Sequence, residues 1–164
     1  MNQKKGIAIV PGSFDPITVG HFAIIEKAAQ MYETVYVAVM INDQKRYMFS
    51  LNERTDIAKA CVAALNNVSV ISSEGMLWKL AKSKGACAIV KGYRNQTDIE
   101  YERKMAEFNK AYYPECETVL VKAENNMLDI SSTAVRARIL SGETLDGLVP
   151  EKSIKIIETI LKKR

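Results

Sequence analysis

Cysteine and histidine are scarce in this chain. Its 164 residues include three cysteines and one histidine. Cys61, Cys87 and Cys116 are odd in number and far apart, which excludes a disulfide framework and a C-x-x-C metal or redox motif. We therefore expect a reducing compartment. Cys61 and Cys87 lie in apolar runs, and we predict that both are core side chains rather than nucleophiles.

Long apolar runs are missing as well. No stretch approaches the roughly 20 apolar residues that a membrane-spanning helix needs. The first apolar stretch, residues 6–10, stops at Pro11 and Gly12 and is too short for the core of a signal peptide. There is also no G-x-x-x-x-G-K-(S/T) loop, which excludes the P-loop kinase mechanism. We expect a soluble, unprocessed, cytoplasmic protein without a membrane partner.

The charge balance is only mildly basic. The 23 Lys and Arg residues exceed the 19 Asp and Glu residues by four. This excess is too small to indicate nucleic-acid binding, and we expect no nucleic-acid partner. It suits an enzyme whose ligands carry several phosphates, because clustered cations raise the local concentration of anions. For the basic residues near the C-terminus, a solvated surface explains the charge equally well.

Short Val- and Ile-rich runs alternate with longer segments of helical period. This alternation is typical of a parallel sheet that is covered on both faces. The sequence predicts an α/β fold: a single doubly wound, Rossmann-like domain over residues 1–164, with helices on both faces of a five-stranded parallel sheet. The strands are expected near residues 6–11, 34–41, 67–72, 86–91 and 117–122.

Helices are expected in the intervening segments. The predicted helices cover about residues 20–31, a segment that starts at Ser50, about 74–84, about 96–113, and two C-terminal segments from about 131 and after 150. Ser50 and Glu53 predict a capping box at the start of the second helix. Because ligands of doubly wound sheets bind beyond the carboxyl ends of the strands, the chemistry is expected just after the strand ends.

The first predicted strand runs into residues 11–21, P-G-S-F-D-P-I-T-V-G-H. This turn delivers a histidine to the start of a helix, where free N–H groups and the helix dipole attract phosphate. Gly20 lets the backbone approach a ligand closely. A lone histidine is usually structural, but His21 lies where a phosphate is expected to bind.

The turn resembles the (T/H)-x-G-H signature of the nucleotidyltransferase superfamily, here Thr18-Val19-Gly20-His21. The whole run 11–21 is similar to the opening of the bacterial phosphopantetheine adenylyltransferase family. The resemblance implies that His21 contacts ATP and stabilises the transition state. It also implies that Ser13 and Phe14 contact the nucleotide and that Ser13 orients the incoming phosphate of the acceptor.

Two further segments carry the same resemblance. Residues 45–54 are similar to the family's K-x-x-M-F-x-x-x-E-R segment, which implies that Lys45 binds the acceptor phosphate and helps to neutralise the reacting phosphates. Without the resemblance, Lys45 could equally be a solvated charge. Residues 91–102 resemble the family's R-G-x-R-x-x-x-D-x-x-Y-E motif. The implied contacts with ATP fall on Gly92, Tyr93, Arg94 and Glu102.

Lys91 stands where the family usually has arginine, in a position that binds the acceptor. Lysine keeps the charge of that position but loses the planar fork that binds two phosphate oxygens at once. The alternative is that Lys91 ends a strand and points into solvent. Leu77 is also among the residues that the resemblance implies for the acceptor.

The fourth segment opens the first C-terminal helix with three hydroxyls. It resembles the family's I-S-S-(S/T)-x-V-R stretch, and the implied ATP contacts are Met127, Leu128, Asp129, Ile130, Ser131, Ser132 and Thr133. A simple N-cap explains one serine. Three hydroxyls in a row are more than a cap requires, and the surplus could hold phosphates at the helix N-terminus. Met127 replaces a frequent aromatic residue, which leaves stacking there in doubt.

The resemblance implies transfer of the adenylyl group of ATP to 4'-phosphopantetheine, with Mg²⁺ on ATP, no protein metal ligand, coenzyme A as a candidate feedback ligand, and a homohexamer. The first alternative is an adenylyltransferase for another acceptor, such as nicotinamide or nicotinate mononucleotide. That class shares both the first turn and the serine-rich stretch. The second alternative is a non-catalytic nucleotide sensor or RNA-binding module that has kept the fold.

Overall fold

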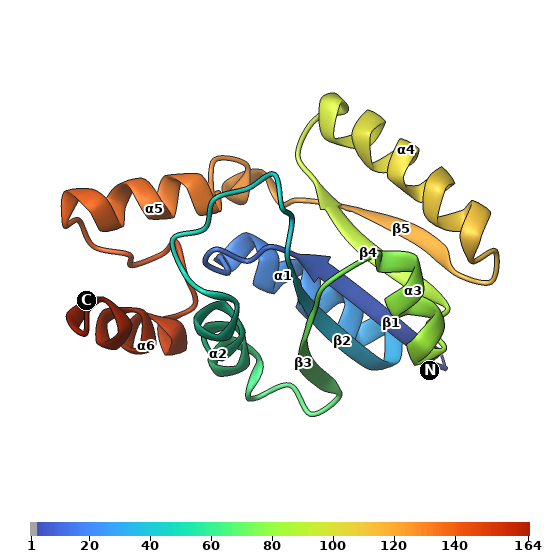
Figure 1. The fold of residues 1–164 in the computed structure, drawn as a ribbon, viewed down its shortest axis with the longest axis horizontal. Helices are drawn as coiled ribbons and strands as arrows, with labels where there is room; N and C mark the ends of the chain where they lie inside the picture. The colour runs from blue at the N-terminus through green and yellow to red at the C-terminus, as the bar shows by residue number, and fades with distance from the viewer. Residues whose placement is uncertain (1–2) are drawn as a thin grey trace.

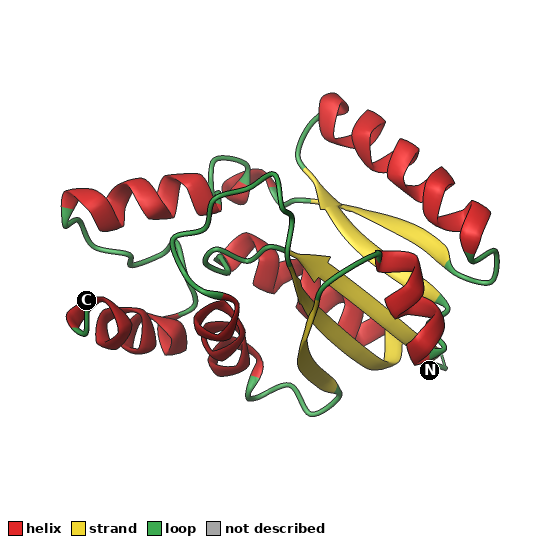
Figure 2. Cartoon of the chain, in the orientation of Figure 1, coloured by secondary structure: helices red, strands yellow, loops and turns green. Residues whose placement is uncertain are grey.

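The Val- and Ile-rich segments form five parallel strands in a computed structural model that describes residues 3–164. Figures 1 and 2 show the strands in one twisted sheet with the order β3-β2-β1-β4-β5. The strands are β1 (Lys5–Gly12), β2 (Tyr32–Met40), β3 (Val68–Ser73), β4 (Ala88–Tyr93) and β5 (Glu117–Lys122). The predicted doubly wound α/β fold is therefore confirmed, with β1 at the centre of the sheet.

Helices follow the strands in the order that the sequence predicts. They are α1 (Val19–Met31), α2 (Leu51–Val62), α3 (Leu77–Lys84), α4 (Gln96–Tyr112), α5 (Ser132–Ser141) and α6 (Glu151–Lys162), with a 3-10 helix, η1 (Asn125–Met127), before α5. The Ser50 and Glu53 capping box is present at the start of α2. No helix within residues 3–164 is both long and apolar enough to cross a membrane.

Alternate residues of the central strand enter two separate cores. Ala8 and Val10 join the larger core, which α1, α2, α5 and α6 cover. Ile9 belongs to the smaller core on the opposite face, under α3. This alternation is what a strand covered on both faces requires, because successive side chains point to opposite sides. In Figure 1, α1 lies behind the sheet, α3 lies in front of it, and α4 flanks the β5 edge.

Two sequence predictions about local structure are wrong. Helix α3 begins at Leu77 rather than near Glu74, because Gly75 has a φ of 112°, outside the helical region. Cys87 is exposed, since it precedes β4 instead of lying within it. Cys61 is buried as predicted, and Cys116 is buried in the smaller core.

The C-terminal helix is expected to unfold together with the sheet. Ile157 of α6 is fully buried in the larger core, so Ile157→Ala should lower the free energy of unfolding by about 2–4 kcal/mol. Leu140 of α5 is 80% exposed, and Leu140→Ala is the matched control with a change of about 0.5 kcal/mol or less. Urea denaturation measures both.

The chain's single tryptophan, Trp78, lies on α3 and so provides a separate probe of the smaller core's side of the sheet. We propose that the described residues form one cooperative unit, in which circular dichroism and Trp78 fluorescence give the same midpoint in wild type and in Ile157→Ala. A variant that loses helix signal before the Trp78 transition would show that α6 unfolds separately.

Candidate active site

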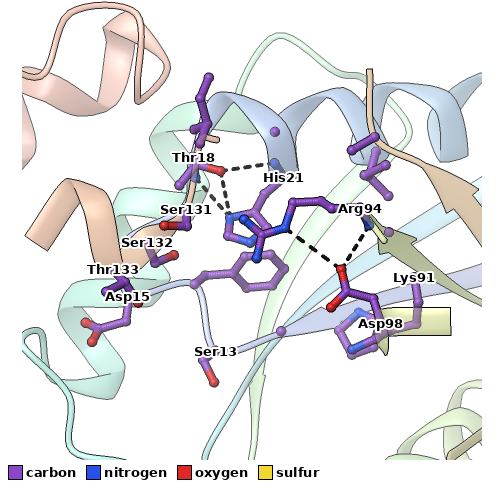
Figure 3. A pocket seen from close by; sticks show the side chains of 18 of the residues that line it. Ser13, Asp15, Thr18, His21, Lys91, Arg94, Asp98, Ser131, Ser132 and Thr133 are labelled. Carbon is purple, nitrogen blue, oxygen red and sulfur yellow. Dashed lines mark hydrogen bonds and ion pairs between the residues drawn. The ribbon is translucent and has the colours of Figure 1, made fainter. Parts of the chain in front are cut away.

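A cavity of about 620 Å³ opens at the carboxyl ends of β1 and β4. The two neighbouring strands pair only at Ala8–Ala88 and Ile9–Ile89, although β1 continues to Gly12 and β4 to Tyr93. Their ends therefore separate, and the cavity occupies the space where the strand order reverses. Figure 3 shows side chains from the β1–α1 turn, from the end of β4 and from the start of α5 facing this cavity.

Most of the predicted site residues line this cavity. They are Ser13, Phe14, His21, Lys45, Lys91, Gly92, Tyr93, Arg94, Glu102, Met127, Ile130, Ser131, Ser132 and Thr133. Three predicted residues do not: Leu128 and Asp129 are outside the lining, and Leu77 lines a second, smaller cavity. The roles assigned to all of these residues stay predictions.

The Thr18–His21 pair forms a capping box at the start of α1. The Thr18 hydroxyl accepts the backbone N–H of His21 at 3.2 Å, and the His21 ring Nδ1 accepts the backbone N–H of Thr18 at 3.0 Å. Dashed lines in Figure 3 mark these contacts. The (T/H)-x-G-H spacing is therefore also a helix-capping spacing, because a cap joins residues three apart.

This cap fixes which ring nitrogen of His21 carries the proton. Since Nδ1 accepts a backbone N–H, the proton of the neutral ring is on Nε2, which is then a donor. Burial and, to a smaller extent, the nearby charges of Lys91 and Arg94 together lower the pKa of His21 to about 4. At neutral pH the ring is an uncharged N–H donor at the wall of the cavity.

The Phe14 ring packs against the His21 ring. The two rings meet edge to face, with centroids 5.1 Å apart and an interplanar angle of 87°. Phe14 is 3% exposed and has a φ of 49°, a left-handed conformation that is rare outside glycine. A Cβ on Gly12 would lie 2.9 Å from the Phe14 ring, so only glycine fits beneath it. The Phe14 side chain thus positions His21.

Asp15 connects three segments around the cavity. Its carboxylate accepts the backbone N–H groups of Met48 and Phe49, both at 2.9 Å, and lies 3.7 Å from the Arg136 guanidinium. Arg136 also donates to the Asp15 carbonyl at 2.8 Å. Asp15 and Arg136 were not among the predicted site residues. Asp15 occurs in the first motif and Arg136 ends the fourth, so the motifs contained the signal.

Lys45 reaches across from the β2–α2 loop to the end of β1. Its Nζ lies 3.5 Å from the Ser13 hydroxyl, so the two residues predicted for the acceptor phosphate meet at one point. Neither Lys45 nor Arg46 has an ion-pair partner in the part of the chain that the structure describes. Both cations therefore remain available to an anionic ligand.

Lys91 and Glu102 form an ion pair at 3.4 Å and line both cavities. The second cavity, of about 70 Å³, lies behind this pair and is lined by Leu77, Ile89, Tyr101, Met105, Ala106, Asn109 and Thr118 as well. Lys91 does not simply point into solvent, which was the alternative for this residue. The pair separates a polar chamber from a smaller one with a more apolar lining.

Arg94 and the start of α5 form the remaining wall. The Arg94 backbone N–H donates to the Asp98 carboxylate at 2.9 Å, and the side chain donates to the Leu128 carbonyl at 3.4 Å. Leu128 thus contributes its backbone to the placement of Arg94. Figure 3 shows Arg94 and Asp98 joined across from the α5 hydroxyls.

The three hydroxyls of the fourth motif have different partners. Ser131 caps α5 by accepting the Ala134 N–H at 3.1 Å, and Ser132 donates its proton to the Pro16 carbonyl at 2.8 Å. Thr133 accepts from Arg136 at 3.1 Å. Within residues 3–164 the hydroxyl protons of Ser131 and Thr133 have no acceptor and can donate to a ligand, whereas that of Ser132 binds the first turn to α5.

The cavity favours an anion. Five cationic side chains line it, namely Lys45, Arg46, Lys91, Arg94 and Arg136, against the three carboxylates of Asp15, Asp98 and Glu102. The start of α1 and the start of α5 also open on it, and each adds the positive end of a helix dipole. This arrangement can hold a polyphosphate and stabilise the charge that develops on it.

A family model and a solved structure are similar to this chain and indicate its class of protein. A family model described as cytidylyltransferase-like matches residues 9–138, a range that contains every wall of the cavity. A crystal structure of a Vibrio parahaemolyticus protein, assigned as a nicotinate-nucleotide adenylyltransferase, has a TM-score of 0.65 and 17% identity, covering 93% of this chain and 99% of that one. The fold is that of the cytidylyltransferase-like nucleotidyltransferases.

Closer relatives narrow the class. A Clostridium perfringens protein is 42% identical over 153 residues, which is 93% of each chain. Relatives from Clostridium novyi and Rubrobacter xylanophilus are 40% and 41% identical over 96% and 94% of this chain, and over 99% and 94% of their own lengths. All three are named phosphopantetheine adenylyltransferase. The chain belongs to the phosphopantetheine adenylyltransferase family, as the sequence motifs predicted.

The single histidine makes the proton assignment directly measurable. In protein labelled with ¹⁵N-histidine, the His21 ring should show the Nε2–H tautomer at pH 7 and titrate near pH 4. An unfolded chain titrates near 6.5, so protonation favours unfolding between these values and stability should fall as the pH is lowered from 6.5 to 4.

His21→Gln provides the control for that measurement, since it removes this contribution to the pH dependence of stability and keeps a polar side chain. A ring that titrates at 6 or above, or a proton on Nδ1 at pH 7, would contradict the proposed donor.

Proposed function

We propose that this protein transfers the adenylyl group of ATP to 4'-phosphopantetheine and releases pyrophosphate, giving dephospho-coenzyme A. The observation that carries the proposal is one cationic cavity that brings His21, Lys45 and the α5 hydroxyls together and adjoins a smaller chamber behind Lys91. Membership of the phosphopantetheine adenylyltransferase family supports the same acceptor.

The reaction needs no nucleophile from the protein. An oxygen of the acceptor phosphate attacks the α-phosphorus in line, the bond from that phosphorus to the bridging oxygen breaks, and pyrophosphate takes both bonding electrons. The acceptor is already an anion at neutral pH, so catalysis depends on positioning and on stabilising charge in the transition state.

Each wall of the cavity has a role in this proposal. The Nε2–H of His21 donates to an α-phosphate oxygen, and this hydrogen bond strengthens as negative charge accumulates there. Lys45 and Ser13, whose polar atoms lie 3.5 Å apart, hold the attacking phosphate. Arg94, with the free hydroxyl protons of Ser131 and Thr133, holds the β- and γ-phosphates.

We propose that the smaller chamber, of about 70 Å³, takes part of the pantetheine arm. Its lining includes Leu77, Met105 and Ala106, which suit the methylenes of an extended chain. Asn109 is 7% exposed, and its side-chain amide makes no hydrogen bond within residues 3–164, so it can pair with an amide of the arm. Lys91, at the boundary of the two chambers, would bind the phosphate from which the arm extends.

Magnesium fits this site as an ion carried by ATP. Residues 3–164 contain no group of three or more His, Cys, Asp or Glu side chains that could hold a metal. The carboxylates of the cavity are each engaged by a cation, while Mg²⁺ is commonly held by substrate phosphates and water. Arg94 and the α5 hydroxyls would hold the metal through those phosphates. The ion would neutralise charge on pyrophosphate as it leaves.

A homohexamer is proposed from the family resemblance, and one face of α4 supports self-association. Tyr101, Met105, Phe108 and Tyr112 recur at helical spacing and are all at least 38% exposed. An apolar stripe of this kind is typical of an interface. Sedimentation equilibrium distinguishes the hexamer from a monomer.

A cytoplasmic location and feedback by coenzyme A are proposed from the same family resemblance.

The proposed acceptor is tested by pyrophosphate release with ATP and each of three acceptors: 4'-phosphopantetheine, nicotinamide mononucleotide and nicotinate mononucleotide. We expect turnover with the first alone.

His21→Ala should lower kcat by several orders of magnitude and leave the calorimetric ATP affinity nearly unchanged, because the lost contact strengthens only in the transition state.

Turnover with a mononucleotide instead would assign the chain to another acceptor. Binding of ATP without turnover on any acceptor would support the non-catalytic alternative. A loss of less than about tenfold in His21→Ala, or about 1.4 kcal/mol, would remove the central role of His21.

Lys91 should act on the acceptor rather than on ATP. We expect Lys91→Ala to raise the KM for 4'-phosphopantetheine by about 10- to 100-fold, since it removes a charge-assisted contact of about 1.5–3 kcal/mol. Lys91→Arg should retain or improve the KM, because the guanidinium fork can bind two phosphate oxygens. Lys104→Ala, at an exposed site on α4, is the matched control. An unchanged KM in Lys91→Ala would leave Lys91 without a role in binding.

A further inference from the structure

Arg54 is a buried cation that forms no direct ion pair within residues 3–164, although the Asp15 carboxylate is near enough to favour its charge. It is the largest of the fully buried side chains and only 1% exposed. No ion pair within the described residues 3–164 includes it. A buried charge without a direct ion pair is costly, so its hydrogen bonds must supply much of the compensation. Where these hydrogen bonds go therefore indicates what the residue does.

Every side-chain hydrogen bond of Arg54 is donated to a backbone carbonyl. The Arg54 Nη1 donates to the carbonyls of Ser13 at 2.6 Å and Met40 at 3.0 Å, and Nε donates to that of Phe49 at 3.2 Å. The guanidinium also lies 3.9 Å from the centre of the Tyr47 ring. One side chain thus contacts the turn after β1, the end of β2 and the residue before the α2 cap.

These contacts enclose the loop that carries Lys45. Met40 ends β2 and Phe49 precedes the N-cap of α2, so Arg54 holds both ends of the segment between them. The bond to the Ser13 carbonyl ties this segment to the β1 turn, where the Lys45 Nζ meets the Ser13 hydroxyl. The distance from Lys45 to Ser13 therefore depends on Arg54.

We infer that Arg54 is a positioning residue for the adenylyl transfer: it acts through the Ser13 and Met40 carbonyls to hold Lys45 and Ser13 in register for the acceptor phosphate. The inference rests on the proposed function. The buried positive charge of Arg54 also makes the electrostatic potential near Lys45 and Ser13 more favourable for an anion before any ligand binds. Arg94 and the α5 hydroxyls, which are proposed for the β- and γ-phosphates, lie on other segments and are not among the hydrogen-bond partners of Arg54.

Only a forked side chain satisfies this geometry. Lysine retains the charge, but its three N–H donors leave a single nitrogen on a flexible stem, so they cannot replace the donors that Arg54 presents from two separate nitrogens in a rigid plane. Arg54→Lys should therefore leave a folded protein whose kcat/KM for the acceptor falls about 10- to 100-fold, since misplacement of about 1 Å can cost 100-fold. The calorimetric ATP dissociation constant should change less than threefold.

The kinetic test uses Arg54→Lys, with Lys59→Ala on the exposed side of the same helix as control. Rates are expressed per folded molecule, from circular dichroism at the assay temperature. In Arg54→Ala, guanidinium ion at non-denaturing millimolar concentration should restore part of the lost kcat/KM, while wild type should not respond. Unchanged kinetics in Arg54→Lys would reduce Arg54 to a structural role and overturn the inference.

A double-mutant cycle with Lys45→Ala separates positioning from a general loss of stability. If Arg54 acts through Lys45, then Arg54→Lys should cost much less in kcat/KM on the Lys45→Ala background than on wild type. Fully additive losses would overturn the inference. Absence of turnover in the wild-type protein itself would instead contradict the proposed function, so the two failures are distinct.

Discussion

The arrangement of the site depends on the position of β1 between β2 and β4. All neighbours in the sheet are parallel, so every strand delivers its next segment to the same edge. The segment after β1 leads into α1 on one face of the sheet. The loops that follow β2 and β4, the strands on either side of β1, border the cavity from its two sides. Because β1 and β4 pair over only two residues, their ends diverge and leave space for a ligand. The charged residues of the four motifs meet there although the motifs are far apart in the sequence.

Hydrogen bonds from side chains to backbone groups hold the walls of this space together. Asp15 accepts the N–H groups of Met48 and Phe49, and Arg54 donates to carbonyls on the same loop. Two oppositely charged side chains therefore fix the β2–α2 loop. The Asp15 carboxylate accepts its N–H groups, and the Arg54 guanidinium donates to its carbonyl groups. Ser132 does the same for α5 by donating to the Pro16 carbonyl. Lys45 and Arg46 on the same loop are left without an ion pair within residues 3–164 and can face a ligand.

The fold and most of the cavity could be predicted because their signals are local. Val- and Ile-rich runs identify strands, and the Ser50–Glu53 spacing identifies a helix start. The start of α3 was missed because the left-handed conformation of Gly75 is set by the loop and not by a period in the sequence. Arg54 ends the second motif, but its role could not be predicted, because an arginine three residues after a helix start usually points into solvent. Only the tertiary fold brings its guanidinium to three backbone carbonyls.

The capping contact of His21 has a consequence for how the reaction responds to acid. A ring whose pKa lies near 4 keeps the same protonation state throughout the range in which a living cell operates. A phosphate monoester, by contrast, gains a proton near pH 6 and becomes a poorer nucleophile. Under the proposed reaction, mild acidification would therefore slow catalysis through the acceptor and not through the enzyme. The substrate itself would then be the pH sensor of the reaction, because the His21 ring keeps its charge state over that range.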